Sequence, residues 1–289
     1  MKRKLFFSIF LSLSIVLLIV QPTVQAESIP ISIVVNGNTI KTDVDPYISN
    51  GTTYVPLRSV EQIEGITIKS WNNKTKTLVV SDPSQQLTFH VNNRNEPGSL
   101  QIKNNRVMVP IRFIAENFNS DVAWNANTKT VQVVKLDEKT KAHLNSDDLT
   151  QSRLAAITIP EINTLKELVG EQSSAGSFKL IFPEGESKAF FTTENGIVSY
   201  YEVKGNAAWL TWSGIIGGSK NEFWITNSGI SSEVGQRPKI NDRVFFYNVS
   251  SHSGQSQYGY ISTSGKETIL GSKDMNSLDE LYPIEEENQ

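Results

Sequence analysis

The pattern of apolar and polar positions in residues 27–135 predicts short strands and two short helices, with the same order of elements occurring twice. In the first copy a strand pattern ends at Pro56, and apolar residues then recur at helical spacing over residues 57–63. The second copy repeats this order after Pro110. Because one such helix is too short to be stable alone in water, each is expected to pack on strands. The pattern therefore predicts an α+β domain, an antiparallel sheet with short helices and two internal repeats.

A proline, an arginine and a tryptophan stand in the same order in both copies. They are Pro56, Arg58 and Trp71 in the first copy, and Pro110, Arg112 and Trp124 in the second. Two identical folds explain this pattern more simply than two identical binding sites. We therefore interpret each arginine as a structural residue that ties the strand–helix junction to carbonyls or a carboxylate, and each tryptophan as a cover for the sheet. The alternatives are an anion clamp, since guanidinium offers a planar fork of donors, and a platform for sugars.

The two copies resemble the stalk-type module of exported bacterial proteins that is named after the N-terminal domain of copper amine oxidases. The resemblance rests on the motif above within residues 50–80 and 104–133, the second copy being the closer match, and it covers residues 29–135. It implies an α+β domain at the cell surface. In the oxidases this part is an appendage and not the catalytic part.

The copper and quinone chemistry of those oxidases is not implied by the resemblance. It would need three histidine ligands and an Asn-Tyr-Asp/Glu cofactor site. This chain has only His90, His143 and His252, far apart in sequence, and no Asn-Tyr dipeptide. We therefore expect no metal, no cofactor and no amine oxidase activity.

Residues 177–271 show many short alternating segments separated by turn signals, which predicts a mainly β domain, a sandwich or a barrel. Residues 136–176 are expected to form a helical bridge and linker. One helix is predicted from Asp147-Asp148 through Leu154, and another from Pro160. Residues 272–289 are expected to be a frayed acidic tail.

Aromatic residues are dense in the predicted β domain. Adjacent residues in a strand face opposite sides, so a doublet such as Phe190-Phe191 places one ring on each face. Outward rings would form a platform for a glycan or a protein; the alternative is that both faces are covered. Trp209 and Trp212 are an odd number of positions apart, so a regular strand cannot show both on one face. The candidate binding residues are Tyr200, Trp209, Trp212, Trp224 and Tyr247.

The first 26 residues have the order of a secretory signal peptide: basic residues 2–4, an apolar run to Val20, and a small-residue cleavage site at Ala26. The apolar run gives a helix of about 24 Å, shorter than the roughly 30 Å hydrocarbon core. The alternative is that the segment is kept as an anchor. We expect a secreted or cell-surface protein with no membrane segment after cleavage.

Charge and cysteine content narrow the class of protein further. Cleavage of the signal peptide removes three of the 27 basic residues. The mature chain then has 24 basic and 30 acidic residues, a formal charge of −6, which disfavours nucleic acid as a partner. The chain has no cysteine, so its core alone must stabilise it outside the cytoplasm.

Motifs of catalysis are missing from the sequence, including the Gly-x-Ser-x-Gly elbow, His-Glu-x-x-His and the P-loop. Glu184, Glu186 and Glu194 offer carboxylates for glycoside hydrolysis, but any β-rich chain offers as many. The sequence favours a non-enzymatic envelope protein, in which the stalk-type module docks to the cell wall or spaces out a β-rich module. That module would bind a cell-wall glycan or another surface protein. The alternative is a secreted hydrolase of cell wall or polysaccharide with its site in residues 177–271. The oligomeric state is left open.

Overall fold

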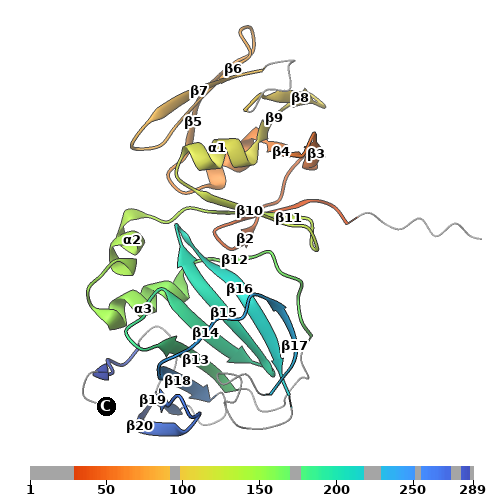
Figure 1. Ribbon diagram of the computed structural model, residues 1–289. Helices are drawn as coiled ribbons and strands as arrows, with labels where there is room; N and C mark the ends of the chain where they lie inside the picture. Colours follow the sequence, from red (N-terminus) through yellow and green to blue (C-terminus); the bar gives the residue numbers. More distant parts are fainter. Residues whose placement is uncertain are drawn as a thin grey trace, which may run out of the picture.

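The computed structural model describes residues 29–91, 98–169, 177–217, 229–250, 255–274 and 281–286. The predicted signal peptide lies outside these residues. The protein is rich in strands, which are divided among several sheets (Figure 1). In the part of the chain that is described, no helix is both long and apolar enough to span a membrane.

The N-terminal strands form three small sheets, with orders β10-β11-β1-β2, β3-β4-β9-β8 and β5-β6-β7. The expectation of a single antiparallel sheet is wrong, because the strands are divided and β1 pairs with β11 in parallel. The elements are β1 (Ser32–Val35), β2 (Asn38–Thr39), β3 (Tyr47–Ser49), β4 (Thr52–Pro56), the 3-10 helix η1 (Leu57–Gln62), β5 (Thr67–Asn72), β6 (Thr77–Ser81), β7 (Gln86–His90), β8 (Gln101–Lys103), β9 (Arg106–Pro110), α1 (Ile111–Asn117), β10 (Asp121–Asn125) and β11 (Thr130–Val134).

Strands β4 and β9 pair at the centre of the middle sheet, with Val55 opposite Val109. Each valine directly precedes the proline of its sequence copy, so equivalent positions of the two copies meet across one strand pair. Both valines are fully buried in a core that takes residues from both copies. The two copies therefore share one core, and neither buries its apolar face alone.

Short-range signals account for the turns and helices of this part. Asn36-Gly37, a dipeptide typical of two-residue hairpin turns, joins β1 and β2, with both residues in the left-handed region that Asn and Gly tolerate best. Leu57, Val60 and Ile63 recur every three residues, the period of a 3-10 helix, and the last two are buried.

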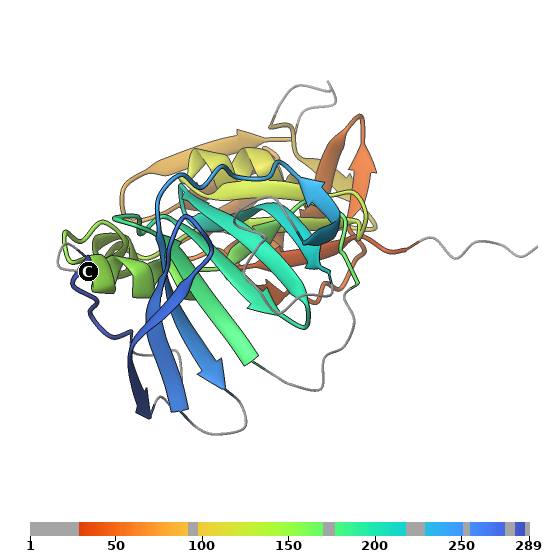
Figure 2. The same cartoon turned by 60° about the horizontal axis from the view of Figure 1, so that its bottom comes forward.

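Residues after β11 form two helices and one large sheet. The sheet has the order β12-β16-β15-β14-β13-β18-β19-β20, and β17 also pairs with β16. It is open and strongly curved, like half of a barrel (Figure 2). The prediction of a mainly β domain is therefore confirmed, but over the described residues the sheet is a single open one and forms neither a sandwich nor a closed barrel. The elements are α2 (Glu138–Leu144), α3 (Leu149–Thr158), β12 (Glu161–Asn163), β13 (Ser177–Pro183), β14 (Ala189–Glu194), β15 (Ile197–Lys204), β16 (Ala207–Ile216), β17 (Ile230–Gly235), β18 (Val244–Ser250), β19 (Gln255–Ile261) and β20 (Glu267–Asp274).

Both faces of the large sheet carry a buried cluster. Phe190 lies in the cluster that includes residues of α3, and Phe191 lies in the cluster on the opposite face. Both rings are almost fully buried. The doublets thus alternate as predicted, and the alternative in which both faces are covered is the one observed.

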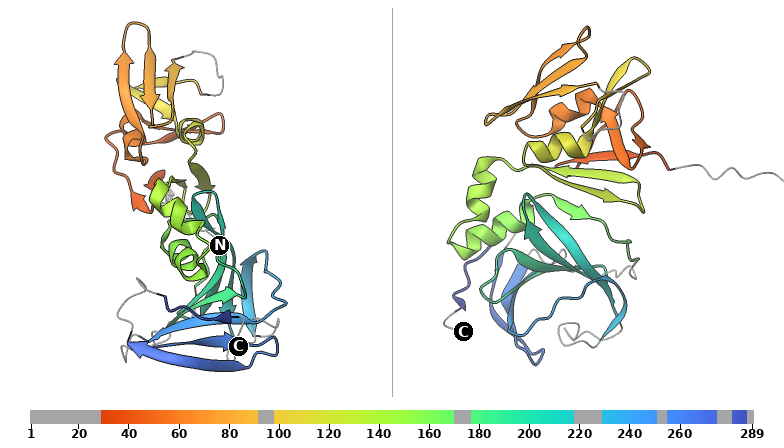
Figure 3. Two further views of the ribbon diagram at one scale, coloured as in Figure 1. Left: turned by 90° about the vertical axis from the view of Figure 1, so that its left-hand side faces the viewer. Right: turned by 45° about the horizontal axis from the view of Figure 1, so that its top comes forward.

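The hydrophobic cluster that contains Phe190 and residues of α3 also joins the two halves of the chain. Ala123 and Val134 of the N-terminal sheets pack in it together with Ile162 and Ala208 of the large sheet. The helices α2 and α3 lie beside this junction (Figure 3). Because the cluster is continuous, we expect the N-terminal part to be rigidly attached and not hinged to the large sheet.

The bridge between the halves only partly follows the prediction. The helix predicted from Asp147-Asp148 is present as α3, and the Asp148 carboxylate accepts a hydrogen bond from the Gln151 N–H at 3.1 Å. The helix predicted from Pro160 is wrong, since Glu161–Asn163 form β12, parallel to β16. Pairing with β16 buries Ile162, and this tertiary gain outweighs a weak local helical pattern.

Two charged residues, Lys135 and Glu286, are buried, although residues 137–139 and Glu285 beside them are exposed. Lys135 pairs with Asp82 (Nζ to Oδ2, 2.9 Å), and both side chains are at most 10% exposed. Burial alone would raise the pKa of Asp82, but hydrogen bonds from Lys135 and Ser84 outweigh it and hold that pKa well below its usual range. In the predicted frayed tail, Glu286 is buried against Arg153.

Candidate functional site

The repeated arginines lie in separate surface depressions, both with exposed side chains. Arg112 reaches Glu116 of its own helix (Nη1 to Oε1, 3.3 Å), a carboxylate that does not tie the strand to the helix. Arg58 lies beside Asp43 in the other depression. The structure therefore does not bring the two arginines together.

The other repeat residues occupy structural positions. Pro56 and Pro110 are buried, each as the last residue of its strand. Trp71 and Trp124 are half-buried and pack against the N-terminal core, as expected for residues that cover the sheets.

Most of the aromatic residues considered for a surface platform are not at the surface. Trp212 and Tyr247 are 1% exposed and Tyr200 is 9% exposed. The Trp212 Nε1–H donates to Glu233 Oε2 at 2.9 Å, and the Tyr247 hydroxyl donates to the Tyr282 carbonyl at 2.7 Å. A platform of these three rings is excluded because both sheet faces are covered. Trp224 lies outside the described residues.

Trp209 is half-buried, and the strand register places it on the same face as Trp212, contrary to the expectation for a regular strand, while its ring also packs against the cluster that contains Tyr201. The register places Trp209 opposite Glu202 and Trp212 opposite Tyr200, and it shifts at Thr211. Such a bulge adds one residue to a strand and changes the face of the residues that follow. The register therefore gives Trp212, Tyr200, Glu202 and Trp209 the same side of the sheet.

A cleft of about 630 Å³ is lined by Tyr200 and Trp209 of this side. Its floor comes from β15 and β16, including Tyr200 and Trp209, and its walls come from residues 164–165 and 235–239. The Trp209 Nε1–H donates to the Lys204 carbonyl at 3.1 Å, which fixes the orientation of the ring.

Gly235 lets the second wall approach the floor. Its φ is +83°, and a Cβ there would lie 2.2 Å from the Thr211 carbonyl oxygen and 2.9 Å from Leu165 Cδ1. The next residue, Gln236, donates its N–H to the Thr211 carbonyl at 3.1 Å. A side chain at position 235 would therefore push the wall away and widen the cleft.

The cleft lining carries more positive than negative charge. Lys204, Arg237 and Lys239 line it, against one lining carboxylate, Glu202, which pairs with Lys204 (Nζ to Oε2, 2.6 Å). Arg237 is held in place because its guanidinium lies 5.2 Å above the Trp212 ring and its Nε is 2.8 Å from Glu233 Oε2.

The sequence did not indicate the wall formed by residues 235–239. Strand β17 leads into it, and its residues Ile230–Gly235 are mostly polar and exposed, without a clear alternation. The one signal in the sequence is Gly235, a residue that permits close backbone approach, followed by the two positive charges of Arg237 and Lys239.

Carboxylates and histidines are not gathered into a reaction centre in the described part of the chain. Glu184 pairs with Arg243 (Oε1 to Nη2, 2.5 Å), and neither Glu186 nor Glu194 lines the cleft. His90 is in β7 and His143 in α2; His252 lies outside the described residues. Among described residues no group of three or more His, Cys, Asp or Glu side chains has the arrangement of a metal site.

Comparison with known families gives two matches, both at the N-terminal part. The family model of the copper amine oxidase N-terminal domain matches residues 34–96 and again residues 91–163, together somewhat less than half of the chain. The second match extends past residue 135 through α2, α3 and β12, further than the resemblance seen in the sequence. The C-terminal part has no family match. Searches of curated proteins and of solved structures find no match.

Proposed function

On the premise that residues 34–163 match the copper amine oxidase N-terminal domain twice, we propose that the protein is a non-enzymatic, exported protein of the cell envelope. The N-terminal part is a two-repeat stalk-type module, and the large sheet is a binding module. The observation that carries this proposal is the cleft floored by Trp209, a half-buried ring of fixed orientation beside basic side chains.

A cell-wall glycan is the ligand that this cleft fits best. Sugar rings present an apolar face that packs on an aromatic ring, while their hydroxyl groups need hydrogen-bonding partners around it. Thr164, Thr211 and Gln236 supply such partners in the lining. A surface protein is the alternative ligand, since tryptophan and arginine also dominate protein interfaces.

The stalk-type module positions the cleft by being fixed to it. The cluster that contains Ala123 and Val134 continues into the large sheet, so the module acts as a rigid spacer. Deleting residues 29–135 to test wall docking would also remove part of this cluster, so point variants are the better test.

The hydrolase alternative has less support from the cleft. Glycoside hydrolases generally use two carboxylic groups, one of them with a raised pKa that makes it a general acid. Glu202 is the one lining carboxylate and pairs with Lys204. The nearby Glu233 has its pKa lowered, first by the hydrogen bond from Trp212 and also by Arg237, which is the wrong direction for an acid.

Replacing Trp209 by alanine should weaken binding of the mature protein to purified cell-wall glycan by about tenfold or more, because a central aromatic contact is lost. Trp71→Ala is the matched control: Trp71 is also half-buried but lies in the N-terminal part, and we expect unchanged binding. Sedimentation with insoluble wall material measures both. Equal loss in the two variants would contradict the assignment, and release of soluble sugar by the wild type would favour the hydrolase.

Export is tested by where the chain is found and where it begins. We expect the protein in the culture fluid or on the cell surface, with Glu27 as its first residue, because Ala26 ends the predicted cleavage site. Fractionation and mass spectrometry of the N-terminal peptide measure this. A full-length chain confined to the cytoplasm would contradict the proposed localisation.

A further inference from the structure

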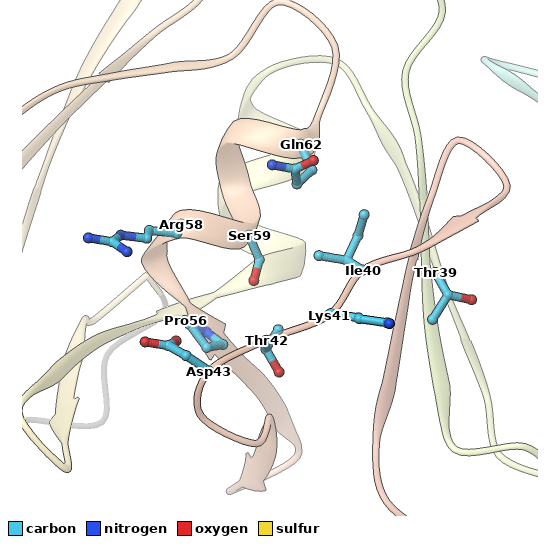
Figure 4. A pocket seen from close by; sticks show the side chains of 9 residues that line it. All are labelled: Thr39, Ile40, Lys41, Thr42, Asp43, Pro56, Arg58, Ser59 and Gln62. Carbon is cyan, nitrogen blue, oxygen red and sulfur yellow. The ribbon is translucent and has the colours of Figure 1, made fainter.

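A second pocket, of about 410 Å³, lies at the strand–helix junction of the first sequence copy (Figure 4). One wall is the segment Thr39–Asp43 and the other is the turn into η1 between Pro56 and Gln62. It is separate from the cleft of the large sheet and shares no lining residue with it. Its chemistry is different too, since no aromatic ring lines it.

The pocket has an excess of positive charge. Lys41 and Arg58 line it, and Asp43 is the one lining carboxylate. That carboxylate is already engaged by Arg106 (Oδ2 to Nε, 2.7 Å). The hydrogen bond from Arg106, and more weakly the charge of Arg58, lower the pKa of Asp43, so it stays ionised without neutralising all three cations.

Arg58 is exposed and forms no ion pair with any residue that the structure describes. In the second sequence copy, the arginine at the equivalent position does form an ion pair. There Arg112 pairs with Glu116, four residues later on the same helix. Position 62, four residues after Arg58, holds glutamine. The two copies therefore differ in whether their arginine is left available for an external anion.

Neutral hydrogen-bond donors complete the pocket. Ser59 is buried at its base, and Thr42 and Gln62 line its sides. In Figure 4 the Arg58 and Lys41 side chains point toward opposite ends, with the hydroxyl groups of Ser59 and Thr42 between them. Because the two cations point away from each other, a ligand with more than one negative group suits the pocket better than one small ion.

We propose that this pocket binds phosphate groups, with Arg58 as the principal contact and Lys41 as the contact for a second phosphate of an extended ligand. Guanidinium matches phosphate with two parallel hydrogen bonds, and phosphate has further oxygens for the hydroxyl donors beside it. Free phosphate and a phosphodiester polymer share this chemistry. The opposite directions of the Arg58 and Lys41 side chains favour the polymer.

The test uses the mature wild-type protein and two probes, inorganic phosphate and a glycerol phosphate oligomer, by calorimetric titration at low salt. We expect the oligomer to bind more tightly, and its affinity to fall with added salt because the contacts are ionic. Arg58→Ala should weaken binding of the oligomer about tenfold, the usual effect of losing one charge-assisted hydrogen-bonding group. Gln62→Glu should have a comparable effect, since it gives Arg58 the partner that Arg112 has.

Arg112→Ala is the matched control, the same substitution at the equivalent and already paired position, and it should leave binding unchanged within twofold. Melting temperatures of all variants show whether each is folded; if Arg58→Ala is not, Gln62→Glu decides. Equal affinity for the two probes would assign the site to free phosphate. Binding of neither probe, or a loss in Arg112→Ala as large as in Arg58→Ala, would overturn the proposal without affecting the glycan cleft.

Discussion

Replacing Arg153 by methionine will lower the free energy of unfolding by about 3–5 kcal/mol, because it removes one partner of a buried ion pair. Arg153 is 1% exposed and pairs with the Glu286 carboxylate. Its Nε also donates to the Glu186 carbonyl at 2.8 Å, and its Nη2 to the Pro183 carbonyl at 3.2 Å. Methionine restores the volume but none of these hydrogen bonds, so buried acceptors remain unpaired.

Arg106→Met is the control for this prediction. Arg106 also pairs with a carboxylate, that of Asp43, but both side chains are about half exposed, so solvent replaces the lost interaction and the change in stability should be far smaller. Urea denaturation of the three proteins gives the comparison. A loss in Arg153→Met no larger than in Arg106→Met would show that the C-terminal segment does not hold α3 in place.

Replacing Asn206 by alanine should cost about 3 kcal/mol, because it leaves several buried polar groups without partners. Asn206 lies in the turn between β15 and β16 and is 9% exposed. Its Nδ2 donates to the Asn119 carbonyl and to Asp121 Oδ2, both at 3.0 Å, and its Oδ1 accepts from the Leu136 N–H at 3.2 Å. These hydrogen bonds join the large sheet to the N-terminal part, so the substitution should also weaken the attachment between the two parts.

The shape of the unfolding transition is the second readout of Asn206→Ala. The wild type should unfold in one transition, since one cluster spans both halves, and the variant should move toward two. Asn145→Ala is the control, because Asn145 makes its hydrogen bonds at the exposed end of α2. Two well separated transitions in the wild type would contradict the rigid attachment.

Local signals in the sequence were enough for much of the fold. Asn36-Gly37 specifies its hairpin through two left-handed residues, and Asn119 ends α1 in the same conformation, as its place after Phe118 predicts. Local sequence does not indicate which strands far apart in the chain will pair. Nothing near β1 indicates that it will lie parallel to β11, almost a hundred residues away, and β12 forms only because β16 offers it an edge.

The candidate site was predictable to a smaller extent. Trp209 and Tyr200 were proposed from aromatic density, and both line the cleft. Trp212 and Tyr247 were proposed on the same ground and are buried, because alternation shows that two faces exist but not that both are covered. The bulge at Thr211 depends on the partner strand and has no signature in β16 alone.

We propose that the cleft of the large sheet, and not the two-repeat module, holds the glycan. Hydrogen–deuterium exchange of the mature protein, with and without soluble wall oligosaccharide, tests it most directly. Slower exchange confined to residues 207–211 and 235–239, with residues 52–58 and 106–112 unchanged, is the predicted result. Slower exchange at those two strand–helix junctions, with none at the cleft, would contradict the claim.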